Sequence, residues 1–503
     1  MSIYKLGQKY LILALLVLIF SFVLVIPDAS ASPLTVAASS SPVASAPSSS
    51  AVVARGGFEA YSEPSGVATN QGDLLVATGG VSNQPVLKFW SSQGGSSWQG
   101  PNLLLPAGYS RSYDSSTSTL PNGNILVVGG AGFGGSPNCP TASGSVFLAK
   151  SSNAGASFNT PVIVDNHLQG GGFDDRPFVT TSSNNNVWVG WSHGSAQDAC
   201  QVIGHNDKVE FATSQNAGSS FSSVFSPSWT LPGASFGVQI AALSHNRAVM
   251  SWAQLLNGQV SVEISFISIS GSFSSPITVA SATAIPRVLP GASFYSFSLP
   301  SLTTLNHHRL ALTWPQWNGS QSIAKIAIGT DAGTNWNFST VSPPTGYDIL
   351  LPAIANAGGG HLRFVYALHG AYGNTMSYQS SDIAVSRSTG IQIGSPAQIS
   401  LTLPGPGFFE LGEFLFVTRF GHNLSTTTVE GDPQASSLQF YTWPTVSKVI
   451  PTSPTTTTTS TNLVPNTSTS HASKTPFYLV VLEVLAVVVF VGIVVTWIRM
   501  NKN

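Results

Sequence analysis

The sequence predicts an all-β fold, a β-propeller of about seven four-stranded blades, and three observations predict it. A short turn motif recurs along the chain, alternating β-rich runs precede its copies, and the composition is that of a turn-rich exterior protein. Charged residues make up 8% of the 503 residues, against roughly 25% in average soluble proteins. The formal net charge of −1 gives no field that attracts a polyanion, so nucleic acid is not expected as a partner.

The turn motif has a small residue, then Asp or an amide two positions later, Gly two further and an aromatic three beyond. Amide and carboxylate side chains and glycine are residues typical of tight turns, and glycine takes a positive φ at no steric cost. The glycines recur about every 60 residues, and the last interval is close to twice that, with a worn copy around Gly271 in between. The motif residues are Gln93, Gly95 and Trp98; Asn153, Gly155 and Phe158; Asn216, Gly218 and Phe221; and Asp331, Gly333 and Trp336.

Pairs of alternating runs indicate the strands of each unit. Six units have a first run followed by a partner run. The first runs are 73–78, 124–129, 187–192, 248–254, 310–314 and 362–367, and their partners are 86–90, 146–150, 209–213, 260–267, 323–328 and 383–386. A seventh unit, 413–420 with 438–443, lacks an outer strand. Residues near 51–58 are expected to supply it and to close the ring, which leaves no long exposed edge. Six blades with an extra strand pair is the alternative.

The repeated turns resemble the Asp-box, or bacterial neuraminidase repeat, of the sialidase superfamily, and the resemblance covers about 66–444. It implies that the polar residue of each motif closes the turn, that the Gly takes a positive φ and that the aromatic ring fills the blade, so the motif residues are expected to be structural. It also implies that the Asp-box turns lie on one face of the propeller and that the loops leading into the innermost strands lie on the other. For a sialidase it also implies three arginines around a carboxylate, a Tyr paired with a Glu, and an Asp acid. The family's Arg-Ile-Pro motif is absent before the first box. The candidates for the catalytic roles are Asp114, Tyr295, Tyr347, Glu410 and Glu413.

The arginines divide between the two faces in this interpretation. Arg111, Arg176 and Arg287 are expected near the loops leading into the innermost strands. Four others are expected in turns on the opposite face, namely Arg247, Arg309, Arg363 and Arg419.

Acids, arginines and aromatic residues gather in those leading loops and in the loops between first and second runs. Carboxylates bind sugar hydroxyls or Ca²⁺, and aromatic faces stack on pyranose rings, so these residues predict a polar ligand site. The segment 174–176 equally fits a local turn with an ion pair. The expected ligand-binding residues are Arg111, Asp174, Asp175, Arg176, Asp348 and Trp317.

No resident metal or other cofactor is expected, although the carboxylates leave room for Ca²⁺. His193, His205 and His369 lack the spacing of metal ligands and are interpreted as surface or hydrogen-bonded groups. Cys139 and Cys200 are the only cysteines, and they fall in corresponding loops of adjacent blades. Outside the cell such a pair is expected to form a disulfide.

The ends of the chain predict secretion and a membrane anchor. An apolar run follows Lys5 and Lys9, and a second apolar run precedes Arg499 and Lys502, which favour the cytoplasmic side. An uncleaved N-terminal anchor is the alternative to a signal peptide. The predicted segments are a signal peptide 1–31, a flexible leader 32–50, the propeller 51–446, a Ser/Thr/Pro-rich stalk 447–474, a transmembrane helix 475–498 and a cytoplasmic tail 499–503. The expected location is the cell membrane, with a single pass and the N-terminal part outside.

Three functions remain open at this point. The first is a cell-surface recognition protein that binds an extracellular glycan or another exterior ligand. The second is a sialidase-like glycoside hydrolase, which would lose turnover when one carboxylate is removed. The third is a passive surface-coat or adhesion scaffold without a substantial pocket.

Overall fold

The structure is a computed structural model of the chain, which divides into two compact units, Met1–Lys448 and Val449–Asn503. All described residues lie in the first unit. They are 46–55, 61–79, 86–93, 97–133, 143–168, 172–195, 208–289, 292, 296–305, 309–330, 333–370, 376–385, 390–402, 415–430 and 437–445. Within these ranges no helix is long and apolar enough to cross a membrane. The predicted signal peptide, stalk and transmembrane helix lie outside them.

The strands of the described ranges form antiparallel groups, each built from consecutive or nearly consecutive strands. The first half comprises β2 (Tyr61–Ala68), β3 (Asp73–Gly79), β4 (Val86–Ser92) and β5 (Trp98–Leu104); β6 (Arg111–Thr119), β7 (Ile125–Phe133), β8 (Ser143–Ser151) and β9 (Val162–Asp165); β10 (Phe173–Thr181), β11 (Val187–Gly194) and β12 (Lys208–Ser214); and β13 (Ala234–Ala242), β14 (Arg247–Leu256), β15 (Gln259–Ser268) and β16 (Ile277–Thr283).

The second half continues this pattern. It comprises β17 (Ser301–Leu305), β18 (Arg309–Trp317), β19 (Ser322–Thr330) and β20 (Trp336–Val341); β21 (Tyr347–Gly358), β22 (His361–Gly370) and β23 (Met376–Val385), with β24 (Ile391–Ile393) and β25 (Ala397–Thr402) both paired to β23; and β26 (Val417–Phe420), β27 (Asn423–Glu430) and β28 (Ser437–Pro444), paired to β1 (Ser49–Arg55).

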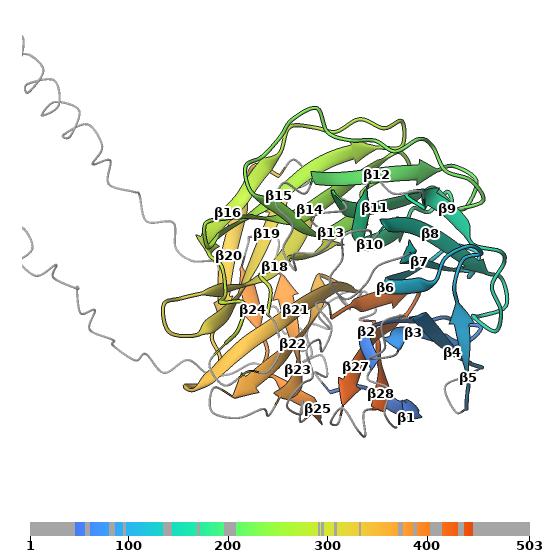
Figure 1. The fold of residues 1–503 in the computed structure, drawn as a ribbon. Helices are drawn as coiled ribbons and strands as arrows, with labels where there is room; N and C mark the ends of the chain where they lie inside the picture. Colours follow the sequence, from blue (N-terminus) through green and yellow to red (C-terminus); the bar gives the residue numbers. More distant parts are fainter. Residues whose placement is uncertain are drawn as a thin grey trace, which may run out of the picture. The chain divides into compact units, whose positions relative to one another are not determined.

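The first strands of these groups contact one another in a closed cycle, β2–β6–β10–β13–β17–β21–β26 and back to β2. Figure 1 shows the later strands of a group, such as β3 to β5 or β14 to β16, at increasing distance from the middle of this cycle. Two of the sheets each contain two neighbouring groups, and in each sheet a single residue pair links the groups. These pairs are Phe173 with Gly144 and Thr283 with Trp317. The described part of the chain is therefore all-β, with antiparallel groups arranged radially around an axis.

Most strand predictions are confirmed. All six predicted pairs of runs coincide with paired strands, from β3 with β4 to β22 with β23, except that residue 124 precedes β7 and residue 386 lies outside the described residues. The N-terminal closure is also confirmed, because β1 pairs antiparallel with β28. The strand β27, which lies between β26 and β28, was not predicted, because its run of threonines lacks the apolar alternation of a strand with one solvent face.

The sequence predicts loops leading into innermost strands at 111–114, 173–176 and 347–348, and these three predictions are wrong. The segments are the first residues of the innermost strands β6, β10 and β21. Their polar composition suggested loops, whereas the structure satisfies these backbones by antiparallel pairing to β7, β11 and β22.

A bulge at a corresponding position hides the strand pattern of these innermost strands. The ladder register shifts there, and one residue takes a positive φ between 48° and 66°. A bulge adds one residue to a strand and redirects the side chains beside it. The bulge residues are Glu63, Asp114, Arg176, Gly237 and Leu351.

The core lies between neighbouring groups and contains several fully buried tryptophans, among them Trp188, Trp252 and Trp314. At two of the repeated turns Asn153 and Asn216 behave alike: each Oδ1 accepts the backbone N–H four residues later at 3.0 Å. The glycines of these turns, Gly155 and Gly218, have φ of +83° and +76°.

Candidate functional site

Three carboxyl groups and one guanidinium meet where the innermost strands begin. Glu63 of β2, Asp114 of β6, and Asp175 and Arg176 of β10 form this axial acidic cluster. The Arg176 Nη1 atom lies 2.6 Å from Asp175 Oδ2, and the Arg176 backbone N–H donates to Asp114 Oδ2 at 3.3 Å. Because Glu63, Asp114 and Arg176 are all bulge residues, the same local backbone irregularity gathers them.

The cluster is largely withdrawn from solvent. Glu63 and Arg176 are each 5% exposed, whereas the Asp175 side chain is 25% exposed. Burial raises the pKa of Asp114 well above its ordinary value, and the neighbouring Glu63 raises it further. Burial likewise raises the pKa of Asp175 to about 7, although the Arg176 charge opposes this shift. Asp175 therefore keeps part of its side chain accessible to a ligand.

Two aromatic rings support the guanidinium. Its Cζ lies 5.1 Å from the centre of the Phe236 ring and 5.4 Å from that of Phe297. A cation held against ring faces keeps part of the electrostatic stabilisation that it loses on leaving water. Arg176 is thus fixed by an ion pair on one side and by rings on the other.

The interior side of the cluster is closed. A cavity of about 10 Å³, the room of roughly one water molecule, lies among Asp114, Arg176, Phe178 and Phe416. A larger cavity of about 310 Å³ lies at the other ends of the innermost strands and is lined largely by threonine and apolar side chains. A ligand of the cluster must therefore approach from the end where these strands begin.

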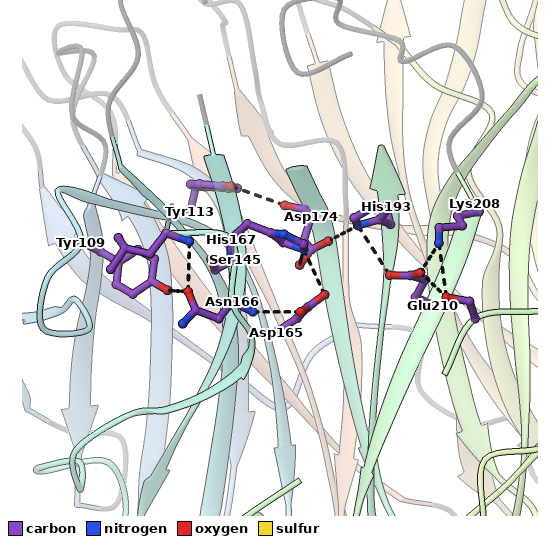
Figure 2. A network of polar contacts seen from close by, with 12 residues as sticks. Tyr109, Tyr113, Ser145, Asp165, Asn166, His167, Asp174, His193, Lys208 and Glu210 are labelled. Atoms are coloured by element: carbon purple, nitrogen blue, oxygen red, sulfur yellow. Dashed lines mark hydrogen bonds and ion pairs between the residues drawn. The ribbon is translucent and has the colours of Figure 1, made fainter. Parts of the chain in front are cut away.

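A second polar network lies on the other side of β10 (Figure 2). His193 Nδ1 is 2.7 Å from Asp174 Oδ1, and His167 Nε2 is 3.2 Å from Asp165 Oδ2 and 3.5 Å from Asp174 Oδ2. We call these four residues the histidine–aspartate cluster. The network continues to Glu210, whose Oε2 lies 3.5 Å from His193 Nδ1.

The charges of this second network are coupled. Burial raises the pKa of Asp174 well above its ordinary value, and the nearby negative charge of Asp165 adds to the shift. Burial is the largest influence on Asp165 and would raise its pKa, but the hydrogen bond and the charge of His167, together with the Asn166 backbone N–H, hold this pKa below the ordinary value. The same bond raises the pKa of His167.

The structure distributes the predicted ligand residues over several places. Asp175 and Arg176 lie in the axial acidic cluster with Asp114, whereas Asp174 points away from it. Arg111, the first residue of β6, has its Cζ 5.9 Å from the Tyr113 ring.

Two other predicted ligand residues have structural contacts. Asp348 is 3% exposed, and its Oδ1 accepts the Ser322 backbone N–H at 2.6 Å, so it fixes the start of β19. Trp317 ends β18 and packs against a core cluster. Tyr347, predicted as a catalytic candidate, is 40% exposed at the start of β21.

Several predictions fall outside the described residues. They concern Tyr295, Glu410 and Glu413 as catalytic candidates, Cys139 and Cys200 as a disulfide, His205, and the motif residues Gly95 and Asp331.

The four arginines predicted in turns all lie in strands, and Arg363 departs furthest from the prediction. Arg363 does not lie in a turn but inside β22, 1% exposed, with its Cζ 5.4 Å from the Trp443 ring. Arg247 and Arg309 begin strands β14 and β18, and Arg419 lies in β26.

The sequence placed Glu63 in a loop leading into an innermost strand, 58–63, but did not predict it as a ligand or catalytic residue, and it gave no sign of Asp165 or His167. A usable signal exists for Glu63, because a proline follows the bulge residue in three innermost strands, at Glu63, Arg176 and Leu351. Aligning the units on this position would have grouped Glu63 with Arg176. No comparable signal exists for Asp165 and His167, which approach Asp174 only through packing between two groups.

No family model and no curated protein matches the chain. Solved structures similar to it include a protein of unknown function from Dyadobacter fermentans, with 13% identity over 70% of this chain and 99% of that one and a TM-score of 0.46. A leech intramolecular trans-sialidase has 10% identity, 68% coverage of both chains and a TM-score of 0.43. An α-L-arabinofuranosidase from Fusarium graminearum has 11% identity over 76% of this chain and 93% of that one, with a TM-score of 0.41. Such distant likenesses assign no activity to this chain.

Proposed function

We propose that the protein is a cell-surface recognition protein whose β-propeller binds an extracellular glycan at the axial acidic cluster. The observation that carries the proposal is the convergence of Glu63, Asp114, Asp175 and Arg176 from three successive innermost strands. In this proposal the antiparallel groups are seven blades, and the C-terminal apolar segment anchors the chain with the propeller outside the cell.

The chemistry of the cluster favours a polyhydroxylated ligand. A carboxylate accepts hydrogen bonds from sugar hydroxyls, and a guanidinium donates to ring and hydroxyl oxygens in a fixed fork. Asp175 offers the first contact because its side chain is 25% exposed, and Arg176 behind it holds the carboxylate in place at 2.6 Å. Only 8% of the residues are of charged types, so four ionisable side chains at one point are unlike the rest of the chain.

The positions of the arginines fit the recognition of a glycan better than the cleavage of sialic acid. Among the described residues Arg176 is the arginine paired within the cluster, whereas Arg363 is buried against Trp443 and Arg247 stacks on Phe266. A neutral glycan needs no triad of arginines around a carboxylate.

Glycoside hydrolysis is the second candidate, and the environment of Asp114 favours it. A buried carboxyl whose pKa is raised stays protonated closer to neutral pH and can serve as a general acid. A partner carboxylate is at hand in Glu63 or Asp175.

Binding and turnover can be measured on the same full-length protein. Glycan-array binding and hydrolysis of fluorogenic glycosides from about pH 3 to 8 would be compared for wild type, Asp175→Asn and Asp114→Asn. Glu263→Gln is the matched control, because Glu263 is a buried carboxylate in β15 that accepts from Thr278 Oγ1 at 3.0 Å.

We expect Asp175→Asn to weaken glycan binding by about tenfold or more, roughly 1.4 kcal/mol, and Glu263→Gln to leave it unchanged. Turnover that disappears in Asp114→Asn would establish the hydrolase instead. A wild-type protein silent in both assays would refute the proposal and leave a surface scaffold.

A further inference from the structure

We infer that the histidine–aspartate cluster is a binding site for one divalent transition-metal ion, Zn²⁺ in the first place, held between two neighbouring strand groups. Asp165 ends β9 and His167 follows it, while Asp174 and His193 face each other across β10 and β11. This inference is independent of the proposed glycan site.

The four side chains already have the geometry of a ligand set. One donor atom from each of them lies within 4.8 Å of every other. Ligands of a tetrahedral zinc ion at about 2.0–2.1 Å are about 3.4 Å apart. His167 Nε2 lies 3.2 Å from Asp165 Oδ2 and 3.5 Å from Asp174 Oδ2, close to that edge length. His193 Nδ1, which is 2.7 Å from Asp174 Oδ1, completes the set after a small rotation.

A buried carboxylate oxygen supplies the second observation. Asp174 is 0% exposed, and its Oδ2 has no hydrogen-bond partner among the residues described, although it faces His167. An unsatisfied buried carboxylate oxygen costs free energy that a bound cation would recover. The side chains of Asp165, His167 and His193 are 17–18% exposed, so an ion can enter from solvent.

The surroundings hold the donors in position. Asp165 Oδ1 accepts the Asn166 backbone N–H at 2.9 Å, which leaves Oδ2 for the metal. The His167 backbone N–H donates to Ser145 Oγ at 2.7 Å. Gly172 makes room, because a Cβ there would lie 2.7 Å from Cε1 of both histidines. Outer contacts of this kind orient the ligands of metal sites.

The donor types select the ion. Ca²⁺ and Mg²⁺ prefer oxygen ligands, whereas two imidazole nitrogens with two carboxylate oxygens suit Zn²⁺ and related transition metals. Lys208 does not compete for the site, because its Nζ pairs with Glu210 Oε1 at 2.6 Å. The expected occupant therefore differs from Ca²⁺, the ion for which the sequence left room.

The test uses the full-length protein, freed of metal with a chelator and dialysed against Zn²⁺. We expect one Zn²⁺ per chain by elemental analysis and a rise in Tm that Ca²⁺ and Mg²⁺ do not produce. Co²⁺ in place of Zn²⁺ should give the strong visible absorption of a tetrahedral site. His167→Ala and His193→Ala should each lose the bound ion and the Tm rise.

His245→Ala is the matched control, because His245 is an exposed histidine whose Nδ1 lies 3.1 Å from Ser183 Oγ, outside the cluster. It should keep one ion per chain. Circular dichroism verifies that each variant is folded, and Asp165→Asn replaces any histidine variant that is not. Absence of Zn²⁺ binding by the wild type, or equal binding by the His167 and His193 variants, would overturn the inference.

Discussion

Asp174 and Asp175 are adjacent in β10, yet their carboxyl groups belong to different sites. Asp174 Oδ1 lies 2.7 Å from His193 Nδ1 between two strand groups, whereas Asp175 Oδ2 lies 2.6 Å from Arg176 Nη1 at the axis. Successive side chains of a strand point to opposite faces, so one strand end serves both clusters. The two sites can consequently be altered separately.

Replacing Arg176 by Met should destabilise the fold by about 3 kcal/mol at neutral pH, because it leaves buried carboxyl groups without their cation. Urea unfolding followed by tryptophan fluorescence measures the change. Arg247→Met is the control: Arg247 is an exposed arginine 4.7 Å from the Phe266 ring, and its loss should cost at most about 1 kcal/mol. Equal losses of unfolding free energy in the two variants would mean that the ion pair of Arg176 with Asp175 contributes no extra stability.

Removing the carboxylate of Asp382 should also destabilise the protein, by about 3 kcal/mol, because the buried Arg363 loses a neighbouring negative charge. Asp382 Oδ2 also lies 2.7 Å from His361 Nδ1. The measurement compares the free energies of unfolding of Asp382→Ala, Arg363→Met and the double variant that carries both changes. The double variant should lose less than the two single variants added together, and strict additivity would contradict the pairing.

The stability of the protein should depend on Asp73 between about pH 4 and 6. Burial raises the pKa of Asp73 from 3.8 to about 6 in the folded state. The folded state then binds more protons than the unfolded state in this window, so stability falls as the pH rises through it. Asp73→Asn should flatten this slope and raise stability at pH 7 by about 1–2 kcal/mol, allowing for solvent screening of a partly exposed group.

Thermal unfolding of wild type and Asp73→Asn at several pH values provides the measurement. Asn122→Asp, which adds an exposed carboxylate in a turn, should leave the slope unchanged. A wild-type Tm that rises from pH 4 to 6 while that of Asp73→Asn does not would reverse the expected sign.

The glycine of the second repeated turn should resist substitution for two separable reasons. Gly155 has φ of +83°, and a Cβ there would lie 2.7 Å from Leu74 Cδ1 of the preceding group. We expect Gly155→Ala to cost about 2–4 kcal/mol, from backbone strain and overpacking together. Gly319 has φ of +103° with nothing near its Cβ position, so Gly319→Ala should cost only about 1 kcal/mol. Similar values from urea unfolding would mean that the contact with Leu74 contributes nothing.

Much of the architecture could be predicted because it is local. Alternating runs marked β3, β4, β7 and β8, and the amides and glycines of the repeated turns marked the hairpins between third and outer strands. The closure by β1 followed from counting, since the last unit lacked a strand. The innermost strands were harder, because a bulge with a residue such as Asp114 at φ of +48° interrupts their alternation.

The period of the repeats was enough to predict, from the sequence, that Glu63, Asp114, Asp175 and Arg176 come near the starts of innermost strands. The bulges that turn these side chains toward one another, and the meeting of Asp165 and His167 with Asp174 and His193, became visible in the folded chain. Pairing and bulges fix where each side chain points within a group, whereas contacts between groups depend on how the groups pack, which no local pattern encodes.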